Sequence, residues 1–147
     1  MTVKRKAKAS GVSFVRYSTT NPSLTWCTLK RVWVLKEPIT IWFVTDSGDR
    51  LTFTVPVGFE TDLASIPRLC RSFIPQVGAH ILAAIVHDWC YRNPSMIWMA
   101  KEDADLLFRK GMEQAGVGRL KRSLMYGGVK YFGASSYQPG IVQLVRL

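Results

Sequence analysis

The sequence contains few cysteines and histidines and no long apolar run. Its three cysteines, Cys27, Cys70 and Cys90, are widely spaced, which argues against a disulfide framework or a structural zinc cluster. A three-histidine zinc site is impossible because the chain has only His80 and His87. No apolar run approaches the ~20 residues that span a bilayer, and the basic N-terminus lacks the apolar stretch of a signal peptide. We therefore expect a chain that is soluble and intracellular when made.

Acidic residues are also scarce. Ten Asp and Glu stand against twenty Lys and Arg, which gives a net charge of +10 and a pI near 9.9. Such a surface favours an anionic partner, whether nucleic acid, phospholipid or an acidic protein. The charge gathers in two places: Lys4, Arg5, Lys6 and Lys8, and then Arg119, Lys121 and Arg122. Neither place has the interleaved aromatic residues of a single-strand binding motif, so specific nucleic-acid recognition is the less favoured interpretation.

The first half of the chain predicts a small antiparallel sheet. Short β-branched and aromatic runs, separated by turn residues, occupy 31–35, 39–44 and 51–55. The polar loop at 45–50 contains a glycine and suits a hairpin. Residues 1–28 are interpreted as a basic arm with an irregular lead-in, and residues 29–147 as a single α+β domain.

Three helices are expected after the sheet: one from beyond Gly78 to about Arg92, one near 101–115 and one over about 119–132. Gly127 and Gly128 in the third helix each cost about 1 kcal/mol relative to alanine, which favours close packing on a neighbouring element. Residues 141–145 are a candidate final strand. The predicted fold class is α+β, with an N-terminal antiparallel sheet followed by about three packed helices.

The first helix carries the most unusual polar pair in the chain. His87 and Asp88 directly follow the apolar run 81–86. On a helix, His80, Ala83, Ala84, His87, Asp88 and Tyr91 share one face, which the two alanines make shallow. Two interpretations are open: His87 is a satisfied core donor beside a locally paired Asp88, or the two residues belong to a functional site.

Further polar residues could complete such a site. Asp105 lies at the edge of the apolar stripe of the second helix, and a short connection makes that helix an antiparallel neighbour of the first. A carboxylate beside His87 would fix its tautomer and make it a competent general base. Asp88 and Asp62 could then hold a hard cation such as calcium. Asp62 and Ser65 are also ordinary helix-capping residues, a role that is favoured over nucleophilic catalysis for Ser65.

Three segments of the chain resemble a family of small uncharacterised proteins encoded by tailed bacteriophages and prophages. The family pattern G-F-x-T-D-x-A-S-x-P matches 58–67, A-A-x-x-H-D-x-x-Y matches 83–91, and E-x-A-D-x-x-F matches 102–108. The first segment adds Thr61 and Ser65 to the candidate polar cluster. The resemblance implies a phage origin and a place in the virion or tail, in an oligomeric assembly with other phage structural proteins. Such a chain would be made in the cytoplasm of the bacterial host.

The segment His-Asp-Trp-Cys-Tyr at 87–91 is similar to the H-D-x-C-Y segment of secreted phospholipases A₂. That resemblance implies that His87 is the general base for water, that Asp88 binds calcium and that Asp105 orients the histidine. Tyr91 would join the supporting hydrogen bonds. The chain departs from that family in lacking its Gly-rich calcium loop, in whose place stand residues 58–67.

Three functions follow from these patterns. The favoured one is a structural virion or tail component whose polar cluster locks residues 58–67 against two helices, while the basic arm binds a neighbouring subunit or nucleic acid. The second is a cation-assisted hydrolase of ester or phosphoester bonds, with His87 as base. The third, a nucleic-acid-binding accessory protein, depends on charge alone.

Overall fold

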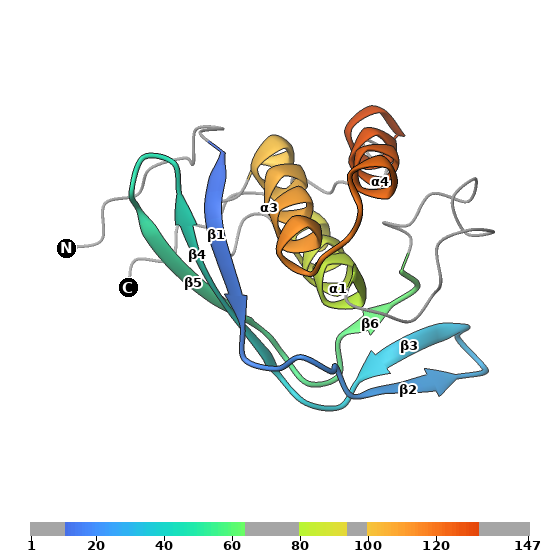
Figure 1. The fold of residues 1–147 in the computed structure, drawn as a ribbon. Coiled ribbons are helices and arrows are strands. Elements are labelled where there is room, and N and C mark those ends of the chain that lie inside the picture. Colours follow the sequence, from blue (N-terminus) through green and yellow to red (C-terminus); the bar gives the residue numbers. More distant parts are fainter. Residues whose placement is uncertain (1–10, 64–79, 94–99, 133–147) are drawn as a thin grey trace.

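A computed structural model of the chain describes residues 11–63, 80–93 and 100–132. Within these ranges the strands come first and the helices follow (Figure 1). The strands are β1 Val12–Tyr17, β2 Leu24–Cys27, β3 Val32–Leu35, β4 Ile39–Thr45, β5 Arg50–Val55 and β6 Glu60–Thr61. The helices are α1 His80–Arg92, α3 Lys101–Gln114 and α4 Arg119–Phe132. The predicted α+β class is confirmed, and the three helices lie close to their predicted ranges.

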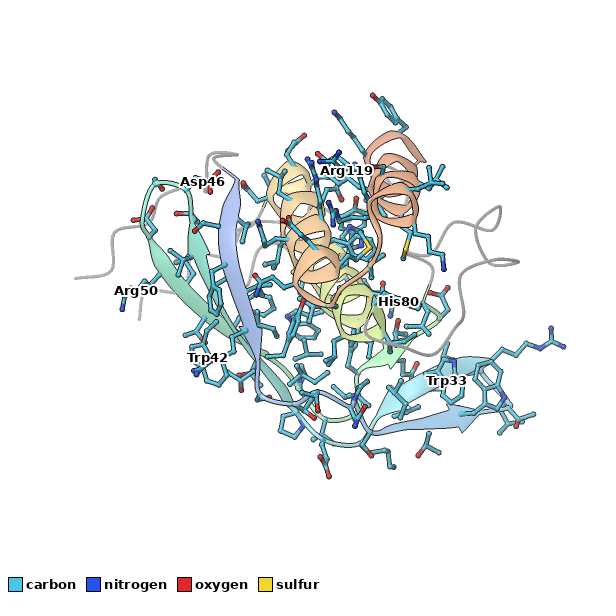
Figure 2. All side chains as sticks on the ribbon, viewed as in Figure 1. Trp33, Trp42, Asp46, Arg50, His80 and Arg119 are labelled. Atoms are coloured by element: carbon cyan, nitrogen blue, oxygen red, sulfur yellow. The ribbon has the colours of Figure 1, made fainter. Side chains whose placement is uncertain are left out.

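The strands form two three-stranded antiparallel sheets, ordered β1-β4-β5 and β2-β3-β6. Strand β4 alternates as its sequence predicts: Ile39, Ile41 and Phe43 are buried, whereas Trp42 points away from the helices (Figure 2). The β4–β5 hairpin turns at Gly48, whose φ of 87° favours glycine. One face of the β1-β4-β5 sheet therefore packs on the helices.

The predicted irregular lead-in is wrong for the stretch that contains β1 and β2. A bulge between Val12 and Phe14 interrupts the alternation of β1, which hides the strand from a pattern-based prediction. The edge of β1 is also closed by a distant side chain. The backbone N–H of Val15 donates to Gln114 Oε1 at 2.7 Å, and Gln114 Nε2 donates to the Val15 carbonyl at 2.8 Å. The expected basic arm, residues 1–10, lies outside the described residues.

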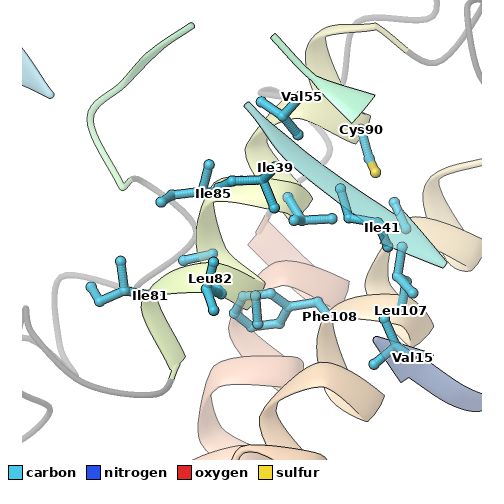
Figure 3. Close-up of a cluster of buried hydrophobic side chains, with 14 of the residues drawn as sticks. Val15, Ile39, Ile41, Val55, Ile81, Leu82, Ile85, Cys90, Leu107 and Phe108 are labelled. Carbon is cyan, nitrogen blue, oxygen red and sulfur yellow. The ribbon is translucent and has the colours of Figure 1, made fainter. Parts of the chain in front are cut away.

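Helix α1 is the centre of the core, because sheet residues cover one side and α3 covers another (Figure 3). All its residues from 80 to 88 are buried. As the sequence predicts, the shallow face of α1 lets a neighbouring element approach closely. A Cβ added to Gly111 of α3 would lie 3.2 Å from Ala83 Cβ and would collide with the Tyr17 hydroxyl. The small residues Ala83 and Gly111 thus allow α1 and α3 to approach closely.

Helix α4 packs on α3 and lies away from the β1-β4-β5 sheet (Figure 1). The prediction of close packing at Gly127 is wrong, because a Cβ there would meet no atom within 4 Å. The candidate strand at 141–145 falls outside the described residues. Among the helices described, none is long and apolar enough to cross a membrane.

Candidate functional site

The predicted site residues form two clusters on different sides of α1. The first, which we name the dyad cluster, consists of His87, Tyr91, Lys101 and Asp105. The second, the β6 cluster, consists of Thr61, Asp88 and Arg92. His87 and Asp88 are adjacent in the chain, but their side chains bind different elements, so the structure divides what the sequence predicted as one constellation.

The dyad cluster is centred on the carboxylate of Asp105. His87 Nε2 lies 2.8 Å from Asp105 Oδ1, and the Tyr91 hydroxyl donates to the same oxygen at 2.5 Å. The other oxygen, Oδ2, accepts a hydrogen bond of 2.8 Å from Lys101 Nζ. The His87 ring also packs between Tyr91 and Phe108, with ring centroids 4.0 and 4.8 Å away. The predicted contact between His87 and Asp105 is confirmed.

Lys101 extends this cluster to a third helix. Besides Asp105, its ammonium group donates to the backbone carbonyls of Val129 at 2.9 Å and Lys130 at 3.2 Å, in the last turn of α4. Its three N–H donors thus have three acceptors, and its charge lies at the negative end of the helix dipole. Lys101 was not predicted as a site residue, although its i,i+4 spacing to Asp105 is a recognised pairing signal.

The two short spacings explain why these four side chains meet. Tyr91 follows His87 by one helical turn on α1, and Lys101 precedes Asp105 by one turn on α3. The two pairs therefore each line one helix face, and the close approach of α1 and α3 brings these faces together.

Burial and hydrogen bonding set the charges of the dyad cluster. Burial lowers the pKa of His87 below 6.5, although the hydrogen bond to Asp105 acts in the opposite direction. Burial alone would raise the pKa of Asp105, but hydrogen bonds from His87, Lys101 and Tyr91 outweigh this effect and lower it below 3.8. At neutral pH the cluster therefore holds a neutral imidazole and an ionised carboxylate paired with Lys101.

The β6 cluster ties α1 to β6. Arg92 Nη2 lies 3.2 Å from Asp88 Oδ2, close enough for an ion pair but not aligned as a hydrogen bond. Arg92 Nη1 donates to the Glu60 carbonyl at 2.5 Å. Burial raises the pKa of Asp88, and a hydrogen bond with Thr61 and the charge of Arg92 compensate only in part. The charged form of Asp88 is thus less well stabilised than that of Asp105.

Thr61 also shapes the segment that follows β6. Its Oγ1 accepts a hydrogen bond of 3.1 Å from the Leu63 N–H, and Leu63 has a φ of 58°, a left-handed conformation that is uncommon outside glycine. The side chain of Asp62 between them is exposed. Ser65, the other hydroxyl of the predicted polar cluster, lies outside the described residues.

Asp88 and Asp62 were the predicted cation ligands. Their charges interact, since Asp62 contributes to the raised pKa of Asp88. Asp88 already faces Arg92 and Thr61, however. Across residues 11–63, 80–93 and 100–132, no group of three or more His, Cys, Asp or Glu side chains is placed to hold a metal ion. The calcium site stays a prediction that depends on two carboxylates.

The geometry of the dyad cluster has two chemical consequences. A hydrogen bond from Nε2 to a carboxylate selects the tautomer in which Nδ1 is the basic ring nitrogen, as a general base requires. The side chain of His87, however, is only 1% exposed. A cavity of about 350 Å³ lies elsewhere, between β1 and α3, and neither cluster lines it.

Comparison with known proteins gives a family. Residues 33–129, more than half of the chain, match the family described as protein of unknown function DUF1353, and the chain belongs to this family. The match contains both clusters. The chain is also similar to the uncharacterized protein y4jT of Sinorhizobium fredii (strain NBRC 101917 / NGR234), with 33% identity over 93 residues. That alignment covers 62% of this chain but only 27% of y4jT. No solved structure matches.

Proposed function

We propose that this DUF1353 protein is a structural component of a bacteriophage virion or tail, in which the dyad cluster fixes the helices and does not perform catalysis. The observation that carries the structural role is that the hydrogen-bonding groups of Asp105 and Lys101 all have partners within the protein. Both oxygens of Asp105 and all three donors of Lys101 are engaged, and the His87 side chain is 1% exposed. The phage assignment is supported by the three sequence segments that resemble the phage family.

A structural role also accounts for which elements each contact joins. Asp105 joins α3 to α1, Lys101 joins α3 to α4, and Arg92 joins α1 to β6. A buried charge that loses its partner costs about 3–5 kcal/mol, so this network favours one arrangement of the elements over others. Exposed aromatic side chains on the sheet, such as Phe14 and Trp42, are candidates for contact with neighbouring subunits.

The virion assignment is tested on particles. Tailed particles are induced from a lysogen that carries this gene, purified, and analysed by quantitative mass spectrometry. We expect the chain to co-purify in a fixed ratio to known tail or capsid proteins. Its presence in the lysate but not in purified particles would contradict a virion role.

A second candidate is a cation-assisted hydrolase of ester or phosphoester bonds. It is favoured by one observation, that the Asp105 carboxylate receives both His87 Nε2 and the Tyr91 hydroxyl. These are the positions to which the phospholipase A₂ resemblance assigns the base, its orienting carboxylate and the supporting tyrosine. In this proposal Asp88, with Asp62, supplies the calcium ligands.

Calorimetric titration with calcium, together with an esterase assay on phospholipid, tests this alternative. Stoichiometric binding that Asp88→Ala abolishes in a folded protein, and ester cleavage that His87→Ala abolishes, would support the hydrolase. If calcium does not bind, and both variants instead lose thermal stability, the structural role is supported. Asp46→Ala is a suitable control, because Asp46 belongs to the distant β4–β5 loop.

A further inference from the structure

Helix α4 has a second apolar face that is not buried in the core. Leu120, Leu124 and Tyr131 are 75%, 43% and 73% exposed. Their offsets of four and eleven residues place them on one side of a helix. The buried residues Met125 and Val129 lie on the opposite side. We name the exposed set, Leu120, Leu124 and Tyr131, the α4 strip.

Basic side chains flank the α4 strip. Lys121 lies on one side of it, and Arg119 and Lys130 lie on the other, all exposed; Arg119 is labelled in Figure 2. The helix contains no Asp or Glu. A neighbouring acid, Glu113 of α3, is paired with Lys110 at 3.1 Å. The surroundings of the strip are therefore strongly positive, and they complement an anionic surface.

The centre of the α4 strip carries no side chain, because a glycine lies there. Gly127 falls between Leu124 and Tyr131 on the same side of the helix, where a Cβ would have no neighbour within 4 Å. Close packing inside the chain therefore does not require this glycine. The Lys101 contacts to the Val129 and Lys130 carbonyls hold the opposite side of the helix against α3. The α4 strip is thus presented outward by a fixed helix.

We infer that the α4 strip docks on the surface of a bilayer containing anionic phospholipids. Exposed leucines gain free energy only when they enter an apolar phase, and a strip of leucines bordered by lysine and arginine fits the boundary between headgroups and acyl chains. Tyrosine is enriched at that boundary, and each basic residue near it adds electrostatic attraction. Nucleic acid would use the same cations, but it offers the leucines no apolar phase.

The test is flotation of the full chain with vesicles of phosphatidylcholine, with and without phosphatidylglycerol. We expect binding to the vesicles that contain phosphatidylglycerol, weakened by salt, and little binding to phosphatidylcholine alone. The double variant L120S/L124S should reduce the partition coefficient roughly tenfold or more, because the apolar area no longer enters the bilayer.

Two control variants separate the strip from general surface effects. Leu29 is 97% exposed in the loop between β2 and β3, so Leu29→Ser removes an exposed leucine away from α4 and should leave binding unchanged. Lys36→Ala removes one exposed cation away from α4 and is compared with Lys121→Ala, which should weaken binding more. Unfolding curves of each variant establish that it is folded.

Three results would overturn the inference. The first is a folded L120S/L124S variant that binds vesicles as well as the wild type does. The second is duplex DNA displacing the chain from vesicles while the leucine substitutions have no effect, since the cations would then serve nucleic acid. The third is a change of sedimentation coefficient in L120S/L124S without a change in vesicle binding, which would assign the strip to contact between copies of the chain.

Discussion

His87 and Asp88 are neighbours in the chain, yet the two clusters to which they belong stabilise charge to different extents. In the dyad cluster, donors from three side chains converge on Asp105, and its pKa falls in spite of burial. In the β6 cluster, Asp88 has Thr61 and a poorly aligned Arg92, and its pKa rises. A buried carboxylate is therefore a stabilising charge only where enough donors reach it.

The opposite pKa shifts of Asp105 and Asp88 predict opposite dependences of folding stability on pH. Because the pKa of Asp105 is lowered in the folded state, its contribution is present above its ordinary value of 3.8 and is lost as the pH falls through the lowered pKa. Because the pKa of Asp88 is raised, its ionisation opposes folding, and this cost appears as the pH rises above 3.8. For His87 the pKa is lowered from 6.5, so acid below that value destabilises the fold.

The largest effect is expected from Asp105→Ala. This change leaves Lys101 without its carboxylate and His87 without its acceptor, and should reduce the free energy of unfolding by about 3–5 kcal/mol. Urea unfolding followed by circular dichroism measures this loss. Asp103→Ala is the matched control on the same helix turn: burial raises the pKa of Asp103 to about 6, so its ionisation opposes folding and its removal should not cause a comparable loss. Equal losses in the two variants would contradict the account.

His87→Phe should have the second-largest effect. It should reduce the free energy of unfolding by about 1–3 kcal/mol, because phenylalanine fills the space of the imidazole ring but removes one hydrogen bond to Asp105. The variant should also lose less stability than the wild type between about pH 7 and pH 5, since it has no imidazole to protonate. Melting temperatures across this range test the point. A variant as acid-sensitive as the wild type would show that His87 is not the group that titrates.

Two glycines test whether close helix approach is needed to assemble the dyad cluster. Gly111→Ala should destabilise by about 1–2 kcal/mol, because the new methyl group collides with the Tyr17 hydroxyl and crowds Ala83. Gly127→Ala should instead stabilise by about 0.5–1 kcal/mol, since its Cβ enters open space in a helix. Chemical denaturation of both variants gives the comparison, and stabilisation by Gly111→Ala would contradict the packing.

Asp88→Asn is expected to have the smallest effect, and its direction depends on pH. At about pH 7 the neutral amide avoids the cost of a buried charge, so the change should stay within about 1 kcal/mol of the wild type. As the pH falls and Asp88 becomes protonated, the stability of the wild type should rise relative to that of Asp88→Asn. Asp105→Asn should show the reverse, with its largest loss near neutral pH. Parallel trends in the two variants would remove the distinction between the clusters.

The sequence predicted some of this arrangement and missed the rest for identifiable reasons. The contact between His87 and Asp105 was predictable, because helical spacing places each on an inward edge of neighbouring helices. The separation of Asp88 from His87 was not, because it depends on where β6 lies. The role of Lys101 in holding α4 depends on backbone carbonyls, which have no sequence signature. Strand β1 was missed because a bulge between Val12 and Phe14 interrupts its alternation, and its contact with the distant Gln114 has no local sequence signal.

The most direct test of the central claim is a nitrogen-15 NMR titration of the His87 ring in the full chain, assigned with His87→Phe. We predict a neutral ring with its proton on Nε2 that does not titrate from about pH 8 down to acid unfolding, and no change on adding calcium. A ring that titrates near or above 6.5, or that responds to calcium, would contradict a sealed structural cluster and favour the hydrolase.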